Sequence, residues 1–360
     1  MTAKTTRETL RDSQAICLVV KARLEPVGEQ RRFQPTGFPE IGQVVYKVPD
    51  GDGQGEAVCI IDSAASMANH LETVCLAGPN EVDLHAELTG LPYVACATED
   101  GGTKRTVCTT LTEGHRLASD YFIGPKAMLG GQPFRDVLRK QMGVKELSRD
   151  KKYFFYPANW GDIYTTVFEY DPNSLVHGLL FAREAIKVSR LLTAHHEAHG
   201  AQRVNSSGVK FDKLGKTLSG QPIFSVAQQT GAIVATFVFD LALLRSYGRN
   251  GKGLTEERKL LLLELGLWKI KQLTDRPFRY RSNCYLQRKS ELETSIDGQP
   301  IEFPGIDIVA RIAEAGFADG RCPTEVMYPA NDLYRVEEPE KKGKKKVKQP
   351  ESEEPLPEEG

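Results

Sequence analysis

The chain has 360 residues, enough for one large domain or two small ones, and its 40% hydrophobic content is typical of a globular core. Lysine and arginine number 47 against 48 aspartates and glutamates. This balance argues against a generic nucleic-acid binder, so a nucleic-acid site would have to depend on local charge along a groove.

The seven cysteines are scattered and form no CxxC pair, which argues against a zinc ribbon. Cysteines within apolar runs are typical of reduced thiols in a cytosolic protein, so we expect a cytoplasmic location. No signal-peptide pattern opens the sequence, and no apolar run approaches the roughly 20 residues that cross a membrane. We therefore expect no membrane partner.

The N-terminal part predicts a central strand followed by a β-hairpin and a helix. Residues 14–24 contain a continuous apolar run that suits a strand buried on both faces. Residues 43–48 and 57–62 predict two strands around a glycine-rich turn. A helix is expected from Ser63 onward, because apolar residues then recur on one helical face.

The start of this helix is a candidate phosphate site. Ser63 or Ser66 can cap it, and a helix N-terminus presents unpaired N–H groups with partial positive charge. Arg31 and Arg32 lie close by in sequence and can add ionic contacts. The alternative is a capped core helix after a hairpin, with two solvated arginines.

The middle of the chain predicts mixed structure. Residues 84–98 and 103–111 suit a second hairpin, and residues 117–121 and 134–142 suit helices. We interpret residues 85–160 as an insertion into a simpler sheet. Downstream, residues 162–170 and 175–181 predict strands separated by a turn, and a helix is expected from Ser189. Residues 201–222 are polar and predict an arm.

Lys187 and Arg190, at the start of that expected helix, either bind phosphates or are solvated. His195 and His199 would lie four residues apart on the helix, a spacing that can chelate zinc. Glu197 does not occupy the position that metalloproteases use, so we favour solvated or hydrogen-bonded histidines and expect no metal.

The C-terminal part predicts strands at residues 223–227 and 233–240 and a buried helix at residues 254–273 capped by Thr255. A strand is expected within residues 276–287, with Arg279 and Arg281 on one face and aromatic residues on the other. Two guanidiniums about 7 Å apart match successive phosphates of single-stranded RNA. The alternative is a solvated edge strand.

The last 25 residues are charged and almost devoid of apolar side chains, so residues 336–360 predict a disordered tail. Removing the eight acidic and six basic residues of this tail leaves 41 basic against 40 acidic residues, a net charge of +1. We therefore expect one folded domain over residues 1–335.

Two strings, RFQPTGFPEIG at residues 32–42 and SAASMANHLE at residues 63–72, together resemble the signature of a CRISPR-associated protein of the RAMP superfamily. The resemblance is to the Cas-seven-type backbone subunit of the type I-G effector, formerly type I-U. The string FEYDPNSLVHGLLFAR at residues 168–183 and the string SRLLTAH at residues 189–195 agree with it.

This resemblance implies an α+β fold with a modified RRM-like, ferredoxin-like palm, finger-like insertions and a hairpin arm. It also implies a non-enzymatic subunit, without cofactor or catalytic residues, that oligomerises along a CRISPR RNA in antiviral defence. The partners would be the guide RNA, target DNA through the guide, further copies of the chain and other subunits of the effector complex. The implied contacts to the RNA backbone are made by Arg32, Gln34, Thr36, Ser63, Ser66 and Asn69.

The alternative from another class is a RAMP-type endoribonuclease that processes precursor CRISPR RNA. In that case His195 or His199 would act as the general acid or base.

Overall fold

The structure is a computed structural model. It describes residues 4–37, 42–49, 55–147, 152–154, 156, 159–204, 227–229, 232–249, 251–317 and 323–333. The predicted tail at residues 336–360 and most of the predicted arm lie outside these residues. Within them, no helix is both long enough and apolar enough to span a bilayer.

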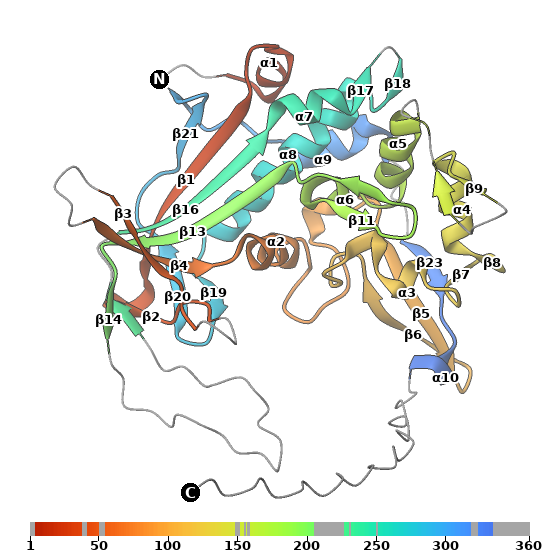
Figure 1. The fold of residues 1–360 in the computed structure, drawn as a ribbon, viewed down its shortest axis with the longest axis horizontal. Helices are drawn as coiled ribbons and strands as arrows, with labels where there is room; N and C mark the ends of the chain where they lie inside the picture. The colour runs from red at the N-terminus through yellow and green to blue at the C-terminus, as the bar shows by residue number, and fades with distance from the viewer. Residues whose placement is uncertain are drawn as a thin grey trace, which may run out of the picture.

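The fold is mixed α+β and is organised around a nine-stranded antiparallel sheet (Figure 1). The strand order is β19-β20-β1-β16-β13-β4-β3, with β21 also paired to β1 and β22 paired to β21. The strands are β1 (Cys17–Pro26), β3 (Val45–Val48), β4 (Glu56–Asp62), β13 (Leu192–His199), β16 (Ala232–Asp240), β19 (Phe278–Arg281), β20 (Cys284–Arg288), β21 (Glu293–Ile296) and β22 (Gln299–Ile301).

One face of this sheet is buried and the other is more open. Burial alternates along β1, β13 and β16, so every second side chain of these strands enters the core. The expectation that β1 is buried on both faces is therefore wrong: Leu18 and Val20 are buried, whereas Lys21 and Arg23 are exposed. An apolar run alone did not distinguish one buried face from two.

Two helices that contact each other cover the buried face, α2 (Ala64–Thr73) and α8 (Glu256–Thr274). Thr255 caps α8 as predicted, and thirteen residues of this helix are buried. At Gly266 the helix lies so close to β16 that an added Cβ would stand 2.7 Å from Phe239. The long buried helix predicted from the leucine run is confirmed.

A second, five-stranded sheet has the order β6-β5-β23-β7-β8. Figure 1 shows α2 between the large sheet and this smaller one. The last strand of this five-stranded sheet in sequence order, β23, lies near the end of the described chain and pairs in parallel with β5. The bounds are β5 (Val94–Asp100), β6 (Thr103–Thr109), β7 (Met128–Leu129), β8 (Gln132–Pro133) and β23 (Thr324–Met327).

The remaining strands form small sheets: β14 (Gln202–Val204) with β15 (Ala227–Gln229) and β2 (Arg32–Phe33), β9 (Lys145–Leu147) with β10 (Lys152–Phe154), β11 (Leu179–Phe181) with β12 (Ile186–Val188), and β17 (Gly248–Arg249) with β18 (Lys252–Gly253). The remaining α-helices are α1 (Thr6–Arg11), α3 (Asp120–Ile123), α4 (Phe134–Gln141), α5 (Trp160–Tyr170), α6 (Pro172–His177), α7 (Leu241–Ser246), α9 (Ile308–Ile312) and α10 (Ala330–Leu333). Short 3-10 turns occur at Val27–Glu29, Ala86–Leu88 and Arg116–Ala118, and a π turn at Ala313–Phe317.

Two sequence predictions in the middle of the chain are wrong. Residues 162–170, predicted as a strand, belong to helix α5, whose buried residues Ile163, Thr166 and Val167 follow helical spacing. The predicted strand at residues 175–181 is divided between helix α6 and strand β11. β-Branched content indicated strands, but the periodicity of burial decides for a helix.

Candidate nucleic-acid interface

The loop after β2 and the start of α2, which the sequence predicts as one site, lie side by side. The backbone N–H of Thr36 donates to Ile61 O at 2.8 Å, and that of Gln34 donates to Asn283 O at 2.9 Å. Because Ile61 is two residues from the N-cap of α2, these bonds hold Gln34 and Thr36 beside the helix start.

Ser63 caps α2, and Ser66 does not. The Oγ of Ser63 accepts a hydrogen bond from the Ser66 N–H at 3.1 Å. Both serines are half-buried, and Asn69, one turn further along the helix, is exposed. A capped end with polar residues open to solvent is what the phosphate-site interpretation needs, although the geometry also suits a purely structural cap.

Asp62 is the centre of a set of polar side chains at this helix end. We call Asp62, Ser63, Ser66, His70 and Arg281 the Asp62 cluster. The carboxylate is fully buried: its Oδ2 lies 2.9 Å from His70 Nε2 and 2.8 Å from Arg281 Nη2, and its Oδ1 accepts from the Ser63 N–H. Burial alone would raise the pKa of Asp62, but the His70 hydrogen bond and the Arg281 charge outweigh it and lower the pKa.

Arg281 is mainly a structural residue. Its Nη1 donates to Ile61 O at 2.7 Å and to Gln34 O at 3.2 Å, so it ties the β2 loop to the end of β4. Its charge is neutralised by Asp62. Arg279 is exposed instead; it donates to Ser282 Oγ at 3.1 Å and lies over the Tyr285 ring. The two predicted arginines therefore have different roles.

The aromatic residues of β19 also pack against the Asp62 cluster, and the strand register shifts between Arg279 and Arg281, so the regular two-face alternation expected of this strand does not extend to Arg281. Phe278 and Tyr280 contact the edge of the His70 ring, each at 5.3 Å between centroids. Below them, the ring of His196 lies 4.6 Å from Tyr280, and neither of its nitrogens has a hydrogen-bond partner among the described residues. Burial lowers the pKa of His196 to about 3, so the ring is neutral.

The Asp62 cluster contains a serine, a histidine and an aspartate, but its geometry is not that of a proton relay. In a catalytic triad the carboxylate and the hydroxyl occupy opposite nitrogens of the imidazole. Here Asp62 Oδ2 and Ser66 Oγ both contact Nε2 of His70, at 2.9 Å and 3.3 Å. The arrangement orients His70 and does not activate Ser66.

The predicted RNA-contacting residues around the N-terminal end of α2 are called the rim below: Arg32, Gln34, Thr36, Ser63, Ser66 and Asn69. Arg32 lies on the β2 side of the rim. It is exposed in β2, which pairs with β15, and β15 pairs with β14. Residues 205–226, which include most of the predicted arm, connect β14 to β15 and lie outside the described residues. Arg32 itself pairs with Gln229 of β15.

Lys187 and Arg190 are not part of this rim. They line a separate cavity together with Arg116, which pairs with Glu72 at the C-terminal end of α2. Glu72 belongs to a buried polar network that the sequence analysis missed. The network consists of Glu72, Arg116, Asp171, Asn173, Ser174, His177 and Lys269. Four of its members fall in the string DPNSLVH at residues 171–177, where the density of polar residues was the available signal.

The prediction of a histidine-bearing helix from Ser189 is wrong, because Leu192–His199 form strand β13. In a strand, residues four apart are about 13 Å apart, too far to share one metal ion. His195 is exposed and His199 contacts Glu56, whereas His196 faces the core. Among the described residues, no group of three or more histidines, cysteines or acidic residues is arranged to hold a metal.

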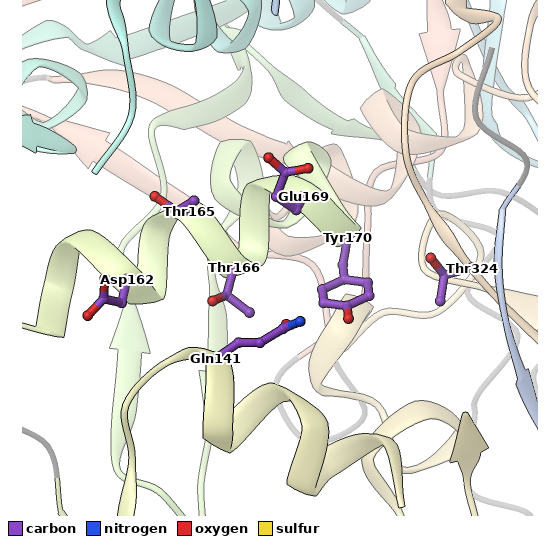
Figure 2. A pocket seen from close by; sticks show the side chains of 7 residues that line it. All are labelled: Gln141, Asp162, Thr165, Thr166, Glu169, Tyr170 and Thr324. Atoms are coloured by element: carbon purple, nitrogen blue, oxygen red, sulfur yellow. The ribbon is translucent and has the colours of Figure 1, made fainter. Parts of the chain in front are cut away.

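A further pocket, of about 520 Å³, lies between α4 and α5 (Figure 2). Figure 2 shows the Gln141 side chain of α4 extending beside Thr166 and Tyr170 of α5. The lining residues that the structure describes include the carboxylates of Asp162 and Glu169 and no basic residue, so the pocket does not suit a phosphate.

Comparisons with known proteins give one informative match. The model of a family described as CRISPR-associated protein GSU0053 matches residues 18–203, more than half of the chain. No curated protein matches. Among solved structures, Csc2 of Thermofilum pendens is similar at 12% identity, over 85% of this chain and 75% of that chain, with a TM-score of 0.27. A score this low does not establish a shared topology.

Proposed function

The chain belongs to the family of CRISPR-associated protein GSU0053, and from this premise we propose that it is a guide-RNA-binding backbone subunit of a type I CRISPR interference complex. Copies of the chain line up along the CRISPR RNA, grip its backbone and leave the bases available for pairing with target DNA. The subunit is not an enzyme, works with the other subunits of a type I-G effector, and acts in the cytoplasm of a prokaryote.

The strand order supports a RAMP-type, ferredoxin-like palm. Neighbours β20-β1-β16-β13 correspond to the order 4-1-3-2 of a βαββαβ unit. In this correspondence α2 is the first crossover, between β1 and β13, and α8 is the second, between β16 and β20. The β3–β4 hairpin and the five-stranded sheet are then additions to the palm.

The observation that carries the proposal is the convergence of two distant segments at the N-terminal end of α2. Thr36 is hydrogen-bonded to Ile61 at the end of β4, two residues before Ser63, and Gln34 is hydrogen-bonded to Asn283 in the turn after β19. Arg32 and Asn69 are exposed near this junction, and so is Arg279. Polar groups and cations of this kind contact phosphates and sugars without reading bases, and a subunit that binds guide RNAs of any sequence requires such contacts.

A pair of substitutions tests this rim without unfolding it. We expect Arg32→Ala combined with Ser66→Glu to weaken RNA binding, because the change removes one cation and adds one anion. Ser66 is the third residue of a helix capped by Ser63, where a glutamate completes a capping box, so the helix stays intact. The matched control is Arg105→Ala combined with Lys252→Ala, two exposed residues whose loss changes the net charge equally.

The measurement is the fluorescence anisotropy of a labelled single-stranded RNA, titrated with the full chain at several salt concentrations. We expect the rim variant to bind at least about tenfold more weakly and to flatten the log–log salt dependence by about 1, whereas the control binds like the parent. The RNA should be recovered intact. Equal binding by all three proteins, or cleavage lost in His195→Ala, would overturn the proposal.

A further inference from the structure

A second basic site lies at the opposite end of α2 from the rim. It is a cavity of about 940 Å³. Its walls are the turn around Arg116, helix α3, the β11–β12 hairpin and the start of β13. The basic residues that line it are His115, Arg116, Arg135, His177, Arg183, Lys187 and Arg190, and Asp120 is the one acidic residue among the lining residues that the structure describes.

Three of these cations have no acidic partner in the part of the chain that the structure describes. Among the described residues, Arg183, Lys187 and Arg190 form no ion pair, whereas Arg116 is held by both oxygens of Glu72. Gly178 contributes to this arrangement. Its φ is +77°, and an added Cβ would stand 2.8 Å from Val188 O and 3.1 Å from Arg190 Cγ, so the glycine leaves room for the arginine stem.

The deeper wall contains buried polar atoms without partners. Arg135 is 9% exposed; its Nε makes no hydrogen bond among the described residues, and the Glu184 carboxylate is 3.7 Å away. His177 is 1% exposed and its Nδ1 is also without a partner in that part of the chain. Lys269 Nζ lies 3.1 Å from His177 Nε2, and with the lysine as the donor of this hydrogen bond the ring proton is on Nδ1. Unpaired buried donors are costly, and an anion in the cavity would offset that cost.

We propose that this cavity binds the phosphate group of one nucleotide, with Arg183, Lys187 and Arg190 around the phosphate and Arg135 and His177 on the inner wall. The volume lies within the range of small-ligand sites, and Ile123, Leu179 and Ala118 provide apolar surface for a base or sugar. Guanidinium groups favour this role because they bind phosphate oxygens in pairs.

The nucleotide is either free or part of an RNA strand. The proposal stands apart from the rim described above, because the two sites share no residue. Arg183→Ala combined with Lys187→Ala removes two exposed cations from the cavity and leaves the rim intact. The control is again Arg105→Ala combined with Lys252→Ala, which makes the same change in charge on other surfaces.

Isothermal titration of the full chain with pyrophosphate and with AMP tests the free ligand, and anisotropy with single-stranded RNA tests the strand. We expect the cavity variant to lose at least about tenfold in affinity for one or more of these probes, and the control to stay within about twofold of the parent. A loss confined to pyrophosphate and AMP identifies a free nucleotide, and a loss for RNA identifies a strand phosphate.

Equal losses in the cavity variant and the control would overturn the proposal, because charge alone would then explain binding. The proposal would also be overturned if the cavity variant bound pyrophosphate, AMP and single-stranded RNA with the same affinities as the parent. The rim function fails separately, because the Arg32→Ala, Ser66→Glu variant tests it without changing the cavity.

Discussion

The two ends of helix α2 hold a carboxylate–arginine pair each, but in different surroundings. At the N-terminal end, Asp62 pairs with Arg281, whose side chain is 23% exposed, among polar groups that reach solvent. At the C-terminal end, about 14 Å away by helix rise, Glu72 pairs with Arg116, which is only 7% exposed. The first pair is suited to contact a ligand through its neighbours, whereas the Glu72–Arg116 pair primarily stabilises the fold behind the basic cavity.

The largest effect on stability is expected at the buried end. Glu72→Ala leaves Arg116 and Lys269 buried without their carboxylate, so the free energy of unfolding should fall by about 3–5 kcal/mol. Urea denaturation measures this loss. Glu99→Ala, at an exposed position, should change stability by less than about 0.5 kcal/mol. A similar small change for both variants would contradict the contrast between the two ends.

Arg281→Ala should cost less, about 2–3 kcal/mol, because Asp62 keeps its hydrogen bonds to His70 and Ser63. Arg279→Ala, two residues away on the same strand, should leave stability within about 0.5 kcal/mol and weaken RNA binding. Denaturation and anisotropy separate these effects. If the two variants were equally stable, the division between a structural and a contacting arginine would be wrong.

The buried network also predicts a pH dependence. Burial raises the pKa of Asp171 to about 7, whereas the carboxyl of an unfolded chain titrates near 3.8. Between these values the folded state binds more protons, so this residue makes stability fall as pH rises from about 4 to 7.

Asp171→Asn keeps the side-chain shape and removes the titration. Compared with the parent, its stability should decline less over that window, by up to about 4 kcal/mol in total at about 1.4 kcal/mol per pH unit, in denaturation experiments at a series of pH values. Asp136→Asn, at an exposed site, serves as the control. Parallel pH profiles for the parent and Asp171→Asn would show that Asp171 is ionised in the folded protein.

The smallest effect is expected at the helix cap. Ser63→Ala removes the acceptor for the Ser66 N–H and should cost about 1 kcal/mol, whereas Ser63→Thr keeps it and should cost little. Thermal denaturation compares the two. A loss of equal size in both variants would mean that the hydroxyl does not act as the cap.

Local sequence signals predicted the first hairpin, helix α2 with its cap, strand β16 and helix α8. Each combines a clear apolar period with a cap or turn residue. They failed where composition and period disagree. In β13, Leu192, Ala194, His196 and Ala198 alternate into the core, but the segment was predicted as a helix.

The site was predictable only in part for a related reason. Ser63 and Ser66 lie next to Asp62 in sequence, but Arg281 reaches Asp62 from more than 200 residues away. Glu72 likewise meets Arg116 and Asn173 across 44 and 101 residues. Such partners depend on the topology of the sheet, and no local pattern in the sequence indicates them.

The most direct test of the RNA-binding claim is photochemical cross-linking of the full chain to a thiouridine-containing single-stranded RNA, with the adducts located by peptide mass spectrometry. We predict adducts in the segments 32–36 and 63–69 that flank the Asp62 cluster. Adducts found only elsewhere on the protein, with none in these two segments, would contradict the proposed RNA path.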